Sequence, residues 1–157
     1  MATIQFKKGD AYLAKLNQLS AAVKDDVIGP AVYSAAGIVA DAINQGISSL
    51  AVSEDPGKEL LNSKQRKGLH DGLGIARLRN DNGFYNVKIG WDGYNSIVTK
   101  SFPKGQPNQM IARSVERGTS FLKATPFVKR AVSATRARAI ESMKQIVDQK
   151  TEEIMKG

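Results

Sequence analysis

The chain has 157 residues, of which 41% are hydrophobic and 24% charged, so it is long and apolar enough to fold around its own core as one domain, residues 1–157. It has no cysteine and one histidine, which excludes disulfides, thiolate metal sites and a cysteine nucleophile. Met1–Lys7 has no apolar stretch typical of a secretion signal, and we find no run of about 18 apolar residues. We therefore expect a cytosolic chain with no membrane contact.

The net charge of +8 is spread unevenly along the chain. Residues 1–57 carry four basic and six acidic side chains, residues 58–104 carry nine and four, and residues 123–157 carry eight and four. The positive middle and C-terminal parts suit a polyanionic partner such as nucleic acid, an anionic surface or an acidic protein. The same charge also suits a solvated surface that keeps the protein soluble. The sequence leaves both interpretations open.

The N-terminal third is predicted to be helical after a strand-like arm at residues 1–9. Asp10 is a suitable N-cap for a helix over residues 11–22. A second helix is predicted from about Asp25 to Leu50, with Pro30 in its first turns. Its apolar stripe, rich in alanine, consists of Val32, Ala35, Ala36, Val39, Ala42, Ile43, Ile47 and Leu50. Small residues let a partner element approach closely, so this pattern indicates a core helix.

Two polar segments are predicted to be flexible loops. Residues 51–68 contain the turn signal Pro56-Gly57 and the basic run 64–67, and residues 95–109 contain two prolines and a glycine. Exposed cations in such loops are candidates for contact with a partner or with DNA. The candidate residues are Lys64, Arg66, Lys67, Lys100 and Lys104.

The centre of the chain is predicted to form an antiparallel sheet. A run over residues 73–78 and a run over residues 84–91 are separated by Asn82-Gly83, a strong hairpin signal. In the second run Tyr85, Val87, Ile89 and Trp91 share one face, as in a half-buried strand. Alternation from Met110 to Glu116 predicts a further strand.

The C-terminal part is predicted to be one long helix. Thr125 is the expected cap and Pro126 the expected first residue, and the helix runs to about Met155, with a polar tail at residues 149–157 that is expected to fray. The fold class is therefore α+β. We expect a sheet of three or four antiparallel strands packed against an alanine-rich N-terminal helix and this long helix.

Motifs for catalysis, metal binding or cofactor binding are not found. The glycine-rich stretch at residues 68–74 is expected to lead into a strand and lacks the sequence of a phosphate-binding loop. His70 and Asp71 are adjacent, and on a strand they would point to opposite faces. The acidic pairs at residues 25–26, 54–55 and 152–153 lie at helix ends or in loops. We therefore expect no enzyme, no cofactor and no metal.

The segments Ile111–Ser120 and Ala124–Ala131, after two helices, a basic loop and a hairpin, resemble a known protein family. The chain is similar to the neck and minor tail-component proteins of long-tailed bacteriophages, also called tail-completion or head–tail joining proteins. Their pattern is a strand ending in Glu-x-Gly-Thr, then Pro-Phe, then an alanine in a closing helix. The matching residues are Glu116, Gly118, Thr119, Pro126, Phe127 and Ala131.

This motif has a physical interpretation of its own. Gly118 permits a tight or left-handed turn, and Thr119 can hydrogen-bond the backbone of that turn. Pro126 starts the helix and Phe127 anchors it in the core. The motif is expected to fix the angle between the sheet and the long helix, and it contains no catalytic group.

The resemblance implies a structural protein of the virion, located at the head–tail junction after assembly in the host cytoplasm. It implies a ring, most simply a hexamer, around the path of the DNA, and this ring docks on connector and tail proteins. The positive charge of the chain then faces either DNA in the lumen or acidic neighbours. Residues 51–68, residues 95–109 and the termini are the expected contact surfaces. The alternative is a nonspecific nucleic-acid-binding accessory protein, whose binding would depend steeply on salt.

Overall fold

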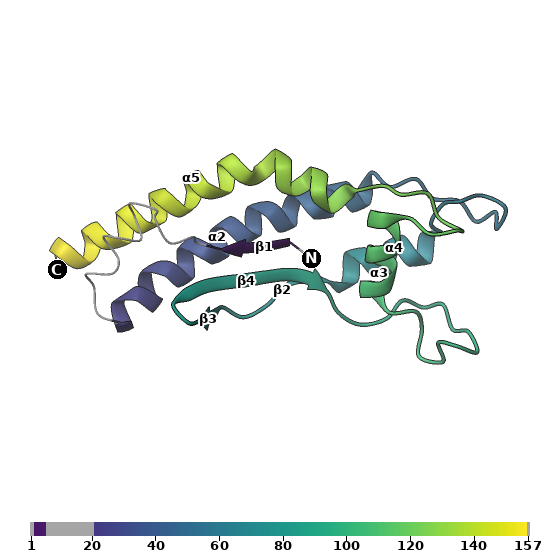
Figure 1. The fold of residues 1–157 in the computed structure, drawn as a ribbon, viewed down its shortest axis with the longest axis horizontal. Coiled ribbons are helices and arrows are strands. Elements are labelled where there is room, and N and C mark those ends of the chain that lie inside the picture. Colours follow the sequence, from purple (N-terminus) through teal and green to yellow (C-terminus); the bar gives the residue numbers. More distant parts are fainter. Residues whose placement is uncertain (1, 6–20, 157) are drawn as a thin grey trace.

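The computed structural model describes residues 2–5 and 21–156, and the helix predicted over residues 11–22 lies almost wholly outside them. These residues fold into two long helices, two short helices and a small antiparallel sheet (Figure 1), which confirms the α+β class. In chain order the elements are β1 (Ala2–Gln5), α2 (Ala21–Ser48), α3 (Ser63–Gly72), β2 (Leu73–Ile75), β3 (Arg79–Asp81), β4 (Phe84–Trp91), α4 (Asn108–Arg117) and α5 (Phe127–Lys156).

The two long helices, α2 and α5, run in opposite directions and contact each other along much of their length (Figure 1). Each buries every fourth residue, with Ala31, Ala35, Val39, Ile43 and Ile47 on α2 and Phe127, Ala131, Thr135, Ala139, Met143 and Val147 on α5. A helix turns once in 3.6 residues, so a stripe of period four winds around it and the two helices cross at an angle. The predicted alanine-rich core helix is confirmed.

The sheet is built around β4, with β1 on one edge and β2 and β3 in succession along the other. Ile75 pairs with Ile89 and Arg79 with Asn86, so four steps along the edge face three steps along β4. Residues 76–78 therefore contain one residue more than the facing part of β4, as in a bulge, and they interrupt the edge. The predicted run at residues 73–78 is a strand over Leu73–Ile75 alone, and β3 begins after it at Arg79. The predicted arm at residues 1–9 contributes β1.

The hairpin between β3 and β4 has the predicted two-residue turn. Asn82 has φ of 55° and Gly83 has φ of 88°, the left-handed values that this turn requires. The side chains of Tyr85, Val87 and Ile89 are buried on the face that α2 covers, as predicted. Asn86, from the opposite face, is buried as well and donates a hydrogen bond to Asp81. Among the described residues no helix covers the opposite face, where Lys88 is exposed (Figure 1).

The strand predicted over residues 110–116 is wrong, because this segment is helix α4. Its buried residues Asn108, Ile111, Ala112 and Val115 follow the spacing i, i+3, i+4, i+7, which is helical. Ile111, Arg113 and Val115 also alternate with Ala112, Ser114 and Glu116, and this alternation of two sets is what predicts a strand. Ala112 is buried between them, which is incompatible with a two-sided strand.

The loop predicted over residues 51–68 is also shorter than expected, because α3 begins at Ser63. The Asn62 side chain accepts a hydrogen bond from the Gln65 N–H at 2.9 Å, and the Gln65 side chain accepts one from the Asn62 N–H at 3.1 Å. This reciprocal pair is a capping box, whose signature Asn-x-x-Gln is present in the sequence. His70 and Asp71 therefore lie on a helix and not on a strand.

The tail from Gln149 to Lys156 is helical, since α5 continues through Lys156. Ion pairs one turn apart connect Lys150 with Glu153 and Lys156 with Glu152. Loop 95–109 also ends earlier than predicted, at the start of α4. Asn95 is buried, and its side chain accepts hydrogen bonds from the N–H groups of Ile97 and Gln106.

One segment, Asp25–Ser48, is long and apolar enough on average to cross a membrane by length and composition, although polar residues interrupt it. Half of it is buried inside the protein, against the sheet and α5. The core helix of a soluble protein passes the same test. Alanines in the stripe between α2 and α5 raise the hydropathy of this segment.

Two glycines inside helices should respond in opposite ways to replacement by alanine. A Cβ at Gly37 would meet no atom within 4 Å, whereas a Cβ at Gly68 would lie 2.4 Å from Asn108 Oδ1 and 2.8 Å from Asn95 Cβ. Gly37→Ala should stabilise the fold by about 0.5–1 kcal/mol, because alanine loses less backbone entropy in a helix. Gly68→Ala should destabilise it by about 1–3 kcal/mol. Urea unfolding measures both, and equal effects would contradict the close contact at Gly68.

Candidate functional site

The start of α5 is capped by Glu116, which belongs to the last turn of α4. The Glu116 carboxylate accepts hydrogen bonds from the N–H groups of Val128 at 2.9 Å and Lys129 at 3.0 Å. A carboxylate at this position satisfies free N–H groups and interacts favourably with the helix dipole. The cap predicted at Thr125 is therefore wrong, and Pro126 directly precedes the first helical residue.

The turn between α4 and α5 has the conformation that the motif predicted. Gly118 has φ of 78°, a value that favours glycine. The N–H of Thr119 donates to the Leu122 carbonyl at 2.8 Å, and its hydroxyl accepts from the Phe121 N–H at 3.2 Å. The Thr125 N–H donates to the Val115 carbonyl at 2.7 Å, which closes the turn. The predicted roles of Gly118 and Thr119 are confirmed.

Phe127 joins α5 to the sheet through an aromatic pair. Its ring meets that of Trp91, at the end of β4, with centroids 5.8 Å apart and planes at 66°. The Trp91 indole Nε1–H donates to the Leu69 carbonyl on α3 at 2.9 Å. Ala131, one turn after Phe127, is buried in the same core. We call Glu116, Gly118, Thr119, Pro126, Phe127 and Ala131 the helix joint, because they connect α4, α5 and β4.

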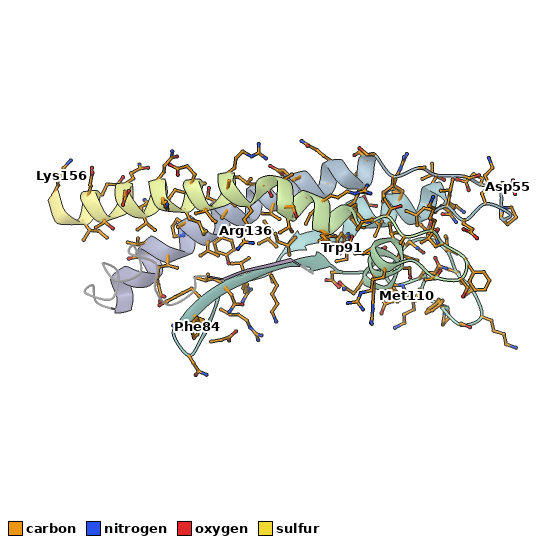
Figure 2. The ribbon with its side chains drawn as sticks, turned by 45° about the horizontal axis from the view of Figure 1, so that its top comes forward. Asp55, Phe84, Trp91, Met110, Arg136 and Lys156 are labelled. Carbon is orange, nitrogen blue, oxygen red and sulfur yellow. The ribbon has the colours of Figure 1, made fainter. Side chains whose placement is uncertain are left out.

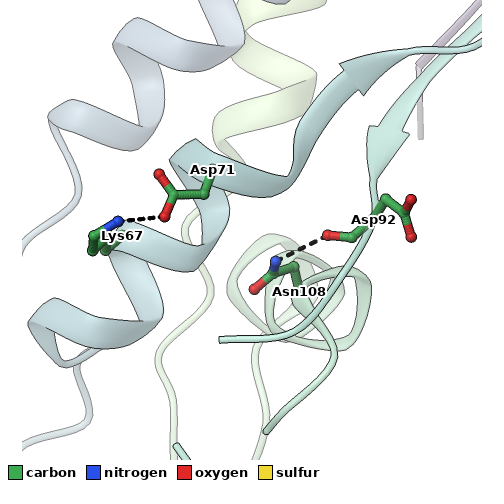
Figure 3. Close-up of polar contacts among 4 residues, drawn as sticks. All are labelled: Lys67, Asp71, Asp92 and Asn108. Atoms are coloured by element: carbon green, nitrogen blue, oxygen red, sulfur yellow. Dashed lines mark hydrogen bonds and ion pairs between the residues drawn. The ribbon is translucent and has the colours of Figure 1, made fainter. Parts of the chain in front are cut away.

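Asn108 supports this region from the first turn of α4 (Figure 3). Its side-chain Nδ2 donates to the Asp92 carbonyl at 2.9 Å, and its backbone N–H donates to the Gly93 carbonyl at 3.0 Å. A Cβ at Gly72 would lie 2.6 Å from Asn108 Nδ2, so α3 packs directly against this side chain. The end of β4 is thus fixed to α3 and α4 together.

The predicted basic contact residues divide into two groups in the structure. Arg66 donates to the Leu50 carbonyl at 3.2 Å near the end of α2, and Lys67 pairs with Asp71 one turn along α3 (Figure 3). These two cations make contacts within the protein. Lys64, Lys100 and Lys104 are exposed. Lys64, Arg66 and Lys67 lie on α3, and Lys100 and Lys104 lie in the loop before α4.

Glu54 holds the loop before α3 against that helix. Its carboxylate accepts a hydrogen bond from the Ser63 N–H at 2.9 Å. Hydrogen bonds from the side chain and then the backbone of Ser63 lower the pKa of Glu54, and the charge of Lys64 adds to this effect. Burial raises the pKa of Tyr85, with a further contribution from Asp25. Both shifts in pKa therefore have a structural cause, which is a loop hydrogen bond for Glu54 and burial in the core for Tyr85.

His70 connects α3 to the last turn of α2. Its Nδ1 lies 2.7 Å from Asn44 Oδ1, and its Nε2 lies 3.4 Å from Ser48 Oγ. This order resembles a nucleophile, base and orienting group, but the Ser48 hydroxyl donates to the Asn44 carbonyl at 3.2 Å and its distance to His70 is long for such a pair. Within residues 2–5 and 21–156, no three acidic, histidine or cysteine side chains could hold a metal ion.

Two open grooves lie on the surface of the described residues. One, of about 340 Å³, lies between loop 53–62, α4 and the turn after it. Phe121 at its rim is 85% exposed and Leu60 is 40% exposed, which is unusual for large apolar side chains. A second groove, of about 410 Å³, lies on the uncovered part of the sheet around Gly74, Lys88 and Gly90.

Comparison with known proteins gives no match to a protein-family model, to a curated protein or to a solved structure.

Removing the carboxylate of Glu116 should destabilise the helix joint. Glu116→Ala should cost about 0.5–2 kcal/mol in the free energy of unfolding, because two N–H groups at the start of α5 lose their acceptor. Glu116→Gln should cost less, since its amide oxygen can still accept a hydrogen bond. Glu141→Ala, on the exposed middle of α5, removes the same charge and should change stability by less than about 0.5 kcal/mol. Equal losses in both alanine variants would contradict the cap.

The Trp91–Phe127 pair can be followed by spectroscopy, because the chain has a single tryptophan. Phe127→Leu should fold but weaken the near-UV circular dichroism signal of Trp91, since the edge-to-face ring contact is lost. Phe127→Ala should cost about 3–5 kcal/mol, because it leaves a cavity among buried side chains. A near-UV signal unchanged in Phe127→Leu would contradict the ring contact.

Proposed function

We propose that this protein is a structural component of a bacteriophage virion, located at the head–tail junction as a neck or tail-completion protein. It acts by assembling into a ring with copies of itself and by docking on connector and tail proteins. The observation that supports the proposal best is the helix joint. All six residues that carry the family resemblance lie at one junction of α4, α5 and β4, where they set the direction of the long helix. The element that ends at Glu116 is helix α4 and not the strand of the family pattern, so the support comes from the turn and the start of α5.

The shape of the described part agrees with a role in assembly. The long helices extend toward one end of the molecule, while loop 53–62, α4 and the turn after it lie toward the other (Figure 1). A ring with rotational symmetry needs two different surfaces on each subunit, one for each neighbour. The apolar rim at Phe121 and the uncovered sheet face are two such surfaces. In this proposal the neighbouring subunit, the connector and the tail are the partners that contact these two surfaces.

Location in the particle is tested by electron microscopy of purified virions labelled with an antibody against this chain. The label should appear at the head–tail junction. Virions that lack the protein would contradict the proposal. Co-expression with connector and tail proteins provides a second measurement, in which the protein should co-purify with them as a ring.

If the protein docks through the groove rim at Phe121, substitutions at two exposed apolar residues should differ in their effect on incorporation into particles. Phe121→Ser should reduce incorporation into particles at least several-fold, because exposed aromatic side chains serve as anchors in protein interfaces. Ile154→Ser, near the end of α5, replaces another exposed apolar side chain and should have little effect. Both variants should unfold like the unmodified protein. Equal incorporation of the two variants would exclude this rim as the docking surface.

A nonspecific nucleic-acid-binding accessory protein is the second candidate. One observation favours it, namely that the exposed cations on the first half of α5 form no ion pair within the described residues. A free accessory protein would bind duplex DNA in isolation at physiological salt, whereas an isolated virion component would bind it measurably only at low salt.

A further inference from the structure

The segment from residue 123 to residue 140 carries five basic residues and no carboxylate. All five side chains are exposed, and they are Lys123, Lys129, Arg130, Arg136 and Arg138. Ion pairs among the described residues lie on α3 and on the last turns of α5, and none involves these five. We call this set the α5 basic surface. Four of them lie on α5 and Lys123 lies just before it, and no other helix or strand of the described residues carries as many exposed cations without an ion pair.

The position of these cations does not help the helix. The N-terminus of a helix carries a partial positive charge, so Lys129 and Arg130 in the first turn of α5 are unfavourable there. The first turn contains no acidic residue of its own, and Glu116 on α4 supplies the compensating carboxylate. Helix stability therefore does not explain this concentration of positive charge. Contact with an anionic partner would explain it, as would a surface that keeps the protein soluble.

The residues between the cations distinguish a nucleic acid from an acidic protein. Ser133, Ala134 and Ala137 are exposed and small, so a phosphate backbone can approach α5 closely. Protein interfaces depend on buried aromatic or long apolar anchors, and Ile140, 38% exposed, is the sole large apolar side chain exposed on this half of the helix. Arg130 and Arg138 are about 12 Å apart along the helix axis, enough to contact several phosphates.

We propose that the α5 basic surface, which includes Arg136 (labelled in Figure 2), binds the phosphate backbone of duplex DNA without reading its sequence. The inference rests on the proposed function in one respect, namely that the protein meets the duplex on the path of DNA through the head–tail junction. The proposed DNA-facing surface is therefore on α5 and not on α3, because Arg66 and Lys67 on α3 have partners within the protein.

The test compares two variants of the full-length protein with the same net charge. The first replaces Lys129, Arg130, Arg136 and Arg138 by glutamine, and the control replaces Lys64, Lys67, Lys100 and Lys104 by glutamine. Each change lowers the formal net charge from +8 to +4, because four positive charges are removed. All eight side chains are exposed, and unfolding in urea checks that both variants fold.

Binding of a short duplex DNA is measured by fluorescence anisotropy at several salt concentrations. Four phosphate contacts give a slope of log K against log salt of about −4, or roughly a 10²-fold loss of affinity between about 50 and 200 mM salt. The α5 variant should lose almost all of this binding and its salt dependence, while the control should keep most of both. DNA of unrelated sequence should bind equally well.

Two results would overturn the proposal. One is an equal loss of DNA binding in both variants, which would show a general effect of net charge. The other is no binding of duplex DNA by the unmodified protein at low salt together with binding of poly-glutamate, which would make the α5 basic surface a site for an acidic protein. Because DNA binding is measured on the isolated protein, absence of the protein from virions overturns the proposed function alone.

Discussion

The direction of α5 depends on the contact between Phe127 and Trp91. Trp91 ends the central strand and is held by the Leu69 carbonyl on α3, while Phe127 is the first residue of the long helix. Glu116 fixes the same point from α4 by accepting two N–H groups of the first turn. Sheet, short helices and long helix therefore share one fixed point, and the crossing of α5 over α2 follows from it.

The basic side chains fall into two groups, those that contact other parts of the protein and those that are exposed to a partner molecule. Arg66 and Lys67 lie in the most basic run of the sequence, yet one holds the end of α2 and the other pairs within α3. The cations of α5 are spread along the chain and less conspicuous, but the helix presents them together to solvent. Local charge density in a sequence is thus a poor guide to the charge that a partner meets.

Sequence patterns predicted the elements whose signals are local. The hairpin at Asn82-Gly83, the buried face of β4, the alanine-rich core helix and the long C-terminal helix all follow from turn chemistry or from a sustained period, and they are confirmed. The segment at residues 110–116 was predicted wrongly, because its seven residues fit both a period of two and a helical period. The capping box at Asn62 was also local, and it was the signal that could have located α3.

By itself the sequence determined the fold class, the main apolar faces and the glycine turn at Gly118, because each depends on neighbours a few residues apart. Tertiary structure alone decided that Glu116 and not Thr125 caps α5, that Trp91 meets Phe127, and that Arg66 has a partner at Leu50. These contacts join residues 12 to 36 positions apart, or elements that meet only after the chain has folded. No periodicity along the chain encodes them, since they depend on how α3, α4 and β4 pack in space.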